Sequence, residues 1–173
     1  MGSLGINIGS FGSRLARERL VQDAIWTKVN FDEADWDTSG GFDAATGSFV
    51  VGQRAKFHFA AGVRLLAPDV PSRHVELLLC KNEKPLQMLT RDVAFHRPDS
   101  VALGFPENPW AEYARGFTRG EVPAGPGDVF EVCVRHSFGE PAYLTARHPG
   151  SAGEGAPSPA ERHPIYFMGL WHA

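Results

Sequence analysis

An acidic stretch in the first third of the chain has residue types and spacing that could bind calcium. Asp35, Asp37 and Ser39 place oxygen ligands at alternate positions, and Gly40 follows where a calcium loop turns sharply. The twelfth position of such a loop carries a glutamate that binds the ion through both oxygens, and here that position is Thr46. We therefore interpret the carboxylates as solvated loop residues and predict no metal site. A calcium ion near Asp35 and Asp37 is the open alternative.

The sequence lacks the common catalytic motifs. Its 7 histidines are scattered, and the two histidines one residue apart that begin a cupin-type metal site are missing. There is no Gly-x-Ser-x-Gly nucleophile turn, no phosphate-binding loop and no dinucleotide-binding fingerprint. We therefore predict a protein that is not an enzyme and that carries no cofactor.

Aromatic and polar residues in or beside two proline-rich loops, 97–112 and 141–164, are better candidates for function. Sugar rings stack on flat aromatic faces, and an arginine fork binds the carboxylates of acidic sugars. The alternative is that these side chains only pin their loops to the body of the protein or to a neighbouring subunit. The predicted ligand-binding residues are Trp110, Tyr113, Tyr143, Arg147 and His148.

The composition limits the class of protein. At 173 residues, of which 43% are hydrophobic, the chain is long enough for one domain with a sizeable core. Its 17 basic and 20 acidic residues give a net charge of −3, so we expect neither nucleic acid nor an anionic membrane as a partner. No signal peptide and no apolar stretch of membrane-spanning length is visible, so we predict synthesis in the cytoplasm and no membrane insertion.

The two cysteines do not have the spacing of a metal site. Cys80 and Cys133 each lie within an apolar run, where a free cysteine behaves as a small core residue. We predict two buried thiols. A disulfide between neighbouring strands is the alternative, and it requires an oxidising compartment.

The N-terminal 24 residues differ in pattern from the rest of the chain. Residues 1–12 alternate glycine and serine with single apolar residues, which predicts a flexible attachment arm. From Ser13 to Ala24 apolar residues recur at helical spacing, which predicts a short helix that serves as a neck or a cap. We therefore divide the chain into 1–24 and 25–173. The residues predicted to contact the larger assembly are Leu4, Ile6, Ile8 and Phe11.

The remainder of the chain has the pattern of a β-protein. Short apolar runs with alternating burial are separated by turns rich in glycine and proline, and no repeat of 20–50 residues is present. This pattern predicts an all-β jelly-roll, a Greek-key sandwich of two antiparallel sheets. The runs expected to form strands are 25–31, 49–66, 75–80, 86–95, 113–122, 128–135 and 165–171.

Three motifs follow one another along this β-region. The turn from Phe42 to Phe49 reads aromatic-Asp-x-x-Thr-Gly-x-Phe, a Gly-Asp pair opens a late strand, and the last strand reads aromatic-x-Gly-apolar. In this order they resemble the globular head of complement component one, subcomponent q, in the tumour-necrosis-factor-like jelly-roll superfamily. The resemblance covers roughly residues 25–173. The residues that carry it are Phe42, Asp43, Thr46, Gly47, Phe49, Gly127, Asp128, Phe167, Gly169 and Trp171.

The resemblance implies a homotrimer that acts by binding. We expect an adhesion module on a virion or extracellular surface, held by its N-terminal arm on a larger assembly and binding a host glycan such as a capsule polysaccharide. The spikes of phages and of gene transfer agents are the setting that fits this pattern. The alternatives are a secreted or surface module that binds a protein receptor, a structural trimerisation cap, and an enzyme with a site assembled from loops.

Overall fold

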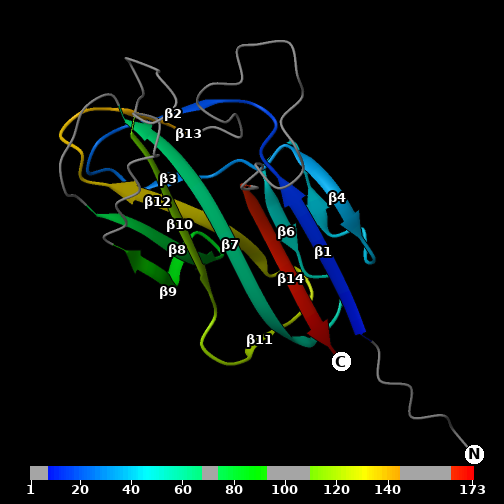
Figure 1. Cartoon of the computed structure of the whole chain (residues 1–173). Helices are drawn as coiled ribbons and strands as arrows, with labels where there is room; N and C mark the ends of the chain where they lie inside the picture. Colours follow the sequence, from blue (N-terminus) through cyan, green and yellow to red (C-terminus); the bar gives the residue numbers. More distant parts are fainter. Residues whose placement is uncertain (1–7, 68–73, 93–109, 145–164) are drawn as a thin grey trace, which may run out of the picture.

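The chain forms two antiparallel sheets that pack face to face (Figure 1). The computed structural model describes residues 8–67, 74–92, 110–144 and 165–173, and within these ranges no helix occurs. The larger sheet is named here the long sheet. One edge of β7 pairs with β14 and then with β13, and its other edge pairs with β11 and then with β10. The sheet continues beyond β14 with β1 and β4, and beyond β13 with β2. Its strands are β1 (Ile8–Arg14), β2 (Arg19–Val21), β4 (Glu33–Asp37), β7 (Ala55–Ala67), β10 (Trp110–Phe117), β11 (Val122–Ala124), β13 (Ala142–Leu144) and β14 (Tyr166–His172).

The second sheet, named here the short sheet, has six strands in the order β5-β6-β12-β8-β9, with β3 also paired to β12. Its central strand, β12, shows strict alternation between buried and half-buried residues, the pattern of a strand with one face on the core. Its strands are β3 (Thr27–Lys28), β5 (Phe42–Asp43), β6 (Ser48–Val50), β8 (Val75–Lys81), β9 (Lys84–Asp92) and β12 (Val129–His136).

The core between the sheets is rich in phenylalanine. Phe57 and Phe59 on β7 point inward as their alternation predicted, and Phe59 meets Phe130 of the short sheet with ring centroids 4.4 Å apart. Phe11 of β1 stacks on Phe49 of β6 at 4.2 Å. Because these contacts join strands of both sheets, burial of their aromatic surface holds the sandwich closed.

The turn between Phe42 and Phe49 forms as predicted. Phe42 pairs with Phe49, and Gly47 closes the turn by donating its backbone N–H to the carbonyl of Asp43 at 2.7 Å. Gly47 has a φ of +68°, and a Cβ there would lie 2.5 Å from the Asn30 side chain. Both the left-handed backbone and the close approach of Asn30 therefore require glycine at this position.

The predicted helix from Ser13 to Ala24 is wrong. Residues 8–14 form β1, which lies between β14 and β4, and residues 19–21 form β2, which pairs with β13. Phe11, predicted as an attachment residue, is fully buried in the core. The arm prediction is therefore corrected for residues 8–12, whereas Leu4 and Ile6 lie outside the described residues.

Other segments differ from the prediction mainly at their ends. The strand expected over 25–31 is reduced to β3, although Val29 and Phe31 are buried beyond it. Residues 110–112, expected in a loop, open β10, and 142–144 form β13 within the range expected to be a loop. Among the described residues, no helix could cross a membrane.

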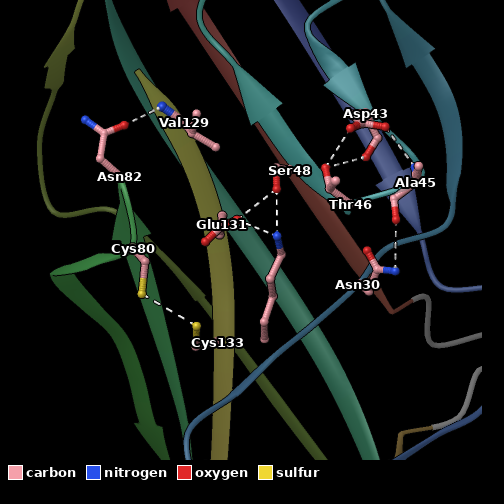
Figure 2. A network of polar contacts seen from close by, with 11 residues as sticks. Asn30, Asp43, Ala45, Thr46, Ser48, Cys80, Asn82, Val129, Glu131 and Cys133 are labelled. Atoms are coloured by element: carbon pink, nitrogen blue, oxygen red, sulfur yellow. Dashed lines mark hydrogen bonds and ion pairs between the residues drawn. The ribbon is translucent and has the colours of Figure 1, made fainter. Parts of the chain in front are cut away.

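The two cysteines face each other as free thiols. Cys80 on β8 and Cys133 on β12 have their Sγ atoms 3.6 Å apart (Figure 2). Cys80 is buried and Cys133 is half-buried, and burial raises the pKa of the Cys133 thiol to about 12. Because the thiolate is the reactive form, both groups are held in their unreactive protonated state at neutral pH.

Candidate functional site

The far end of β7 brings together three of the five predicted ligand-binding residues. Trp110 on β10 pairs with Ala67, and Tyr113 pairs with Arg64. Tyr143 on β13 pairs with Leu66 from the other side of β7. Tyr113 and Tyr143 share the outer-face register of the long sheet, whereas Trp110 has the opposite parity on its strand. Arg147 and His148 lie outside the described residues.

Tyr143 projects from the surface next to Leu20 of β2. The two residues form a cross-strand pair, and 53% of Tyr143 and 46% of Leu20 are exposed. Their neighbours on the same strands, Val21 and Leu144, are buried, so the alternation fixes Tyr143 on the outer face. An exposed aromatic ring on a rigid strand can stack on a ligand at little entropic cost.

Arg64 lies between these tyrosines and was not among the residues predicted from the sequence. It is 4% exposed, and no described residue offers a hydrogen-bond partner to its buried Nη1 atom. Burial lowers the pKa of the Arg64 guanidinium. The sequence held one signal for it, because Arg64 is the only charged residue between His58 and Leu66 in an otherwise apolar strand.

Two cations near the opposite end of β7 have carboxylate partners. A surface hollow of about 810 Å³ is lined there by Arg54, Lys56, Lys81 and residues of β11 and β14. Lys56 pairs with Glu121 at 2.7 Å, and Lys81 pairs with Asp128 at 2.8 Å. This end also holds both described ends of the chain, because β1 begins beside the last residues of β14 (Figure 1).

The outer face of the long sheet carries exposed apolar residues between these two ends. Phe117, Ala60 and Met168 occupy one row across β10, β7 and β14, and Leu170 lies one position further along the same face. Phe117 is 72% exposed and Leu170 52% exposed. Exposed apolar side chains gathered on one flat sheet face are typical of an interaction surface.

A polar network on the short sheet ties three strands together (Figure 2). Lys28 on β3 donates to Ser48 on β6 at 2.8 Å and also to Glu131 on β12. Ser48 donates to the same Glu131 carboxylate at 2.9 Å and is 3% exposed. The lysine charge is matched by a carboxylate and the hydroxyl is covered, so this arrangement is a structural link between strands.

The acidic stretch that resembled a calcium loop uses its carboxylates within the fold. Asp37 accepts the backbone N–H groups of Ser39 and Phe42, and Asp35 pairs with Arg14 at 3.3 Å. Asp43 accepts the hydroxyl of Thr46 at 2.8 Å, a hydrogen bond that lowers the pKa of Asp43. Across the described residues, no three His, Cys, Asp or Glu side chains gather as they would around a metal ion.

Known structures share the architecture of this chain. A murine APRIL structure has 14% sequence identity and a TM-score of 0.52, covering 96% of this chain and 100% of that one. The fold is that of a tumour-necrosis-factor-like jelly roll. The structure of Eiger TNF from S. frugiperda matches at 12% identity with a TM-score of 0.50, covering 97% and 92%. The globular domain of zebrafish complement 1qA has 14% identity and a TM-score of 0.49, covering 95% and 94%.

The similarity to the APRIL and Eiger structures confirms the jelly-roll fold that the sequence motifs predicted. The two sheets, the Phe42–Phe49 turn and the closing strand stand where the resemblance placed them. No family model and no curated protein sequence matches the chain.

Proposed function

We propose that this protein is a homotrimeric adhesion module that binds a host cell-surface glycan. Its N-terminal residues attach it to a larger assembly, and the setting that fits best is the spike or fibre head of a phage or gene transfer agent. Ligand binding belongs to the end of the long sheet that holds Tyr113 and Tyr143. A protein receptor is the competing ligand.

The proposal rests on one observation: the start of the described chain and the exposed tyrosine lie at opposite ends of the long sheet. Ile8, where the described chain begins, pairs with His172, which in turn pairs with Lys56 near the start of β7. Tyr143 pairs with Leu66 near the end of β7. At roughly 3.3 Å per residue, the strand separates these two ends by about 30 Å. A protein attached through residues before Ile8 thus presents its aromatic end away from the attachment.

The exposed apolar residues on the outer face of the long sheet support the homotrimer. Phe117, Leu170 and their half-buried neighbours lie between the two ends, so copies that pack through this face leave both ends accessible. A closed cyclic assembly would cover the same patch on each copy and then stop growing. Three parallel copies would also present three ligand sites together, which strengthens binding to a repeating polysaccharide.

Retention on cells tests the glycan proposal. The purified protein is incubated with host cells that carry or lack their capsule, and the bound fraction is measured. We expect retention on capsulated cells only, with a loss in Tyr143→Ala and Tyr113→Ala. Trp36→Ala is the matched control, because Trp36 is exposed on β4 at the other edge of the long sheet. Equal retention on both cell types, or in all variants, would contradict glycan binding.

The assembly is tested by incorporation. Residues 1–7 are deleted from the chain, and particles purified from the source strain are analysed for the protein by mass spectrometry. We expect the intact chain in the particles and the shortened chain in the soluble fraction. Incorporation of the shortened chain would show that attachment uses another part of the protein, and absence of the intact chain from particles would contradict the virion setting.

A further inference from the structure

Arg64 is a buried cation with no counter-charge among the described residues. Its side chain projects from the outer-face register of β7, yet the residue is 4% exposed and Nη1 has no hydrogen-bond partner within the described ranges. Two other arginines of the sheets pair with carboxylates: Arg135 meets Glu76 at 2.5 Å and Arg14 meets Glu33 at 2.6 Å. Arg64 makes no comparable ion pair with a described residue.

This arrangement destabilises the protein unless an anion completes it. Removing a guanidinium from water costs several kcal/mol by general estimates, and a hydrogen-bonded carboxylate is the ordinary means of recovering that cost. Burial lowers the pKa of Arg64, but arginine stays protonated at neutral pH. The guanidinium therefore carries its positive charge, and an anion that pairs with it must come from outside the described residues.

Three of the outer-face positions around Arg64 are tyrosines, and another is Arg115. Tyr113 lies directly opposite on β10. On the other side of β7, the diagonal positions belong to Tyr166, which pairs with Gly62, and to Tyr143, which pairs with Leu66. Three tyrosine positions thus lie around one cation.

We propose that Arg64 binds the carboxylate of an acidic sugar within the glycan, while the tyrosines contact the sugar ring. This inference rests on the proposed function and narrows its ligand to uronic or similar carboxylate-bearing saccharides. The planar guanidinium fork matches the two oxygens of a carboxylate, and aromatic faces suit the apolar face of a pyranose ring. A neutral sugar leaves the buried charge unpaired, so the site discriminates against it.

The test measures binding of methyl glucuronide and of methyl glucoside, its neutral counterpart, to the full chain by isothermal titration. We expect the wild type to bind the glucuronide and not the glucoside. Arg64→Met removes the charge at similar volume and should weaken glucuronide binding at least tenfold, while Arg64→Lys keeps the charge, loses the fork and should fall in between. Arg119→Met is the matched control, because Arg119 is an exposed arginine that follows β10 and lies away from this end of β7.

The stability of the variants separates a lost site from a lost fold. Arg64→Met should melt at or above the wild-type temperature without ligand, because it removes an unpaired buried charge. Should Arg64→Met not fold, the ratio of the glucuronide affinities of Arg64→Lys and the wild type tests the proposal instead. Equal binding of the two sugars by the wild type, or undiminished glucuronide binding in both Arg64 variants, would overturn the proposal.

Two further outcomes identify other occupants. Loss of the oligomer in Arg64→Met, with no glucuronide binding by the wild type, would assign Arg64 to a carboxylate of a second copy and overturn the sugar site. Glucuronide binding that depends on Arg64, without capsule-dependent retention on cells, would support the site and contradict the adhesion role.

Discussion

Asp128 fixes the turn that opens β12. Its carboxylate accepts the backbone N–H of Gly125 at 2.8 Å and the side-chain amide of Asn82 at 2.9 Å, and it pairs with Lys81. These contacts favour the charged form and lower the pKa of Asp128 from 3.8 to about 2. The sequence identified Asp128 as part of a motif, and the structure supplies the reason for an aspartate there.

The lowered pKa of Asp128 gives a pH dependence with a defined sign. The contribution is complete at pH values above the ordinary pKa of the unfolded chain and is lost as the pH falls from about 4 towards about 2. We expect Asp128→Asn to lower the melting temperature at pH 7 and to flatten its decline between pH 5 and pH 2. Glu140→Gln, at an exposed position, is the control. A decline as steep in Asp128→Asn as in the wild type would contradict this role.

Gly169 is required because its neighbours leave no room for a side chain, and its backbone conformation does not need glycine. A Cβ at this position would lie 2.4 Å from the Phe11 ring and 3.1 Å from the Phe59 ring. We expect Gly169→Ala to lower the free energy of unfolding by about 1–3 kcal/mol, the usual cost of overpacking a core. Denaturant unfolding measures it, with Gly52→Ala as control because a Cβ at Gly52 meets nothing within 4 Å. Equal losses in the two variants would contradict the packing argument.

At the scale of elements, local patterns predicted what local interactions decide. The Phe42–Phe49 turn depends on Asp43 and Gly47, whose turn chemistry is legible in the sequence, and it formed as predicted. The long apolar strands also matched, because alternation along β7 and β12 reflects one buried face.

The segment from Ser13 to Ala24 failed because distant partners decide its structure. Its apolar residues fit a helical period, yet a helix of about three turns is marginal in water. Strand pairing with β13 and β14, more than 100 residues later in the sequence, satisfies the backbone instead and buries Leu15 and Val21. No local signal contains that information.

The place of β1 inside the long sheet predicts different results for two deletions. Removing residues 1–7 leaves all of β1 in place, so we expect it to lower the melting temperature less than removal of residues 1–12. Removing residues 1–12 deletes Phe11 and most of the β1 pairing, and loss of a buried phenylalanine alone costs about 3–5 kcal/mol. Thermal unfolding followed by circular dichroism measures both. A wild-type melting temperature after the longer deletion would show that β1 is dispensable.

At the scale of the whole molecule, the sequence indicated the types of the candidate site residues but not their grouping. The sequence shows Tyr113 and Tyr143 only as aromatic residues in or beside loops, whereas their common face depends on both strands pairing with β7. The sequence does not predict Arg64 as a site residue, because a charged residue within a strand is expected to face solvent until its burial is known. Long-range register, which no local pattern reports, assembles the candidate site.

The apolar row of the outer face yields a prediction for the assembly. We expect light scattering at micromolar concentration to give three times the chain mass of 18.9 kDa, and Leu170→Asp to reduce it to the monomer. A charge buried at the centre of such an interface disfavours association. Leu86→Asp is the control, because Leu86 is also exposed but lies on β9 of the short sheet. A monomeric wild type, or a trimer that persists in Leu170→Asp, would contradict packing through this face.

The position of β1 also determines how the molecule responds to mechanical force. A load applied between Ile8 and the far end of β7 runs along the strands, because β1, β14 and β7 are neighbours in one antiparallel sheet. The hydrogen bonds between β1 and β14, which span Ile8 to Arg14, lie perpendicular to that load and are strained together in shear. Peeling β1 away from β14 would break these hydrogen bonds one pair at a time. The shear geometry loads them all at once, so β1 resists separation from β14 while the protein is pulled from its two ends.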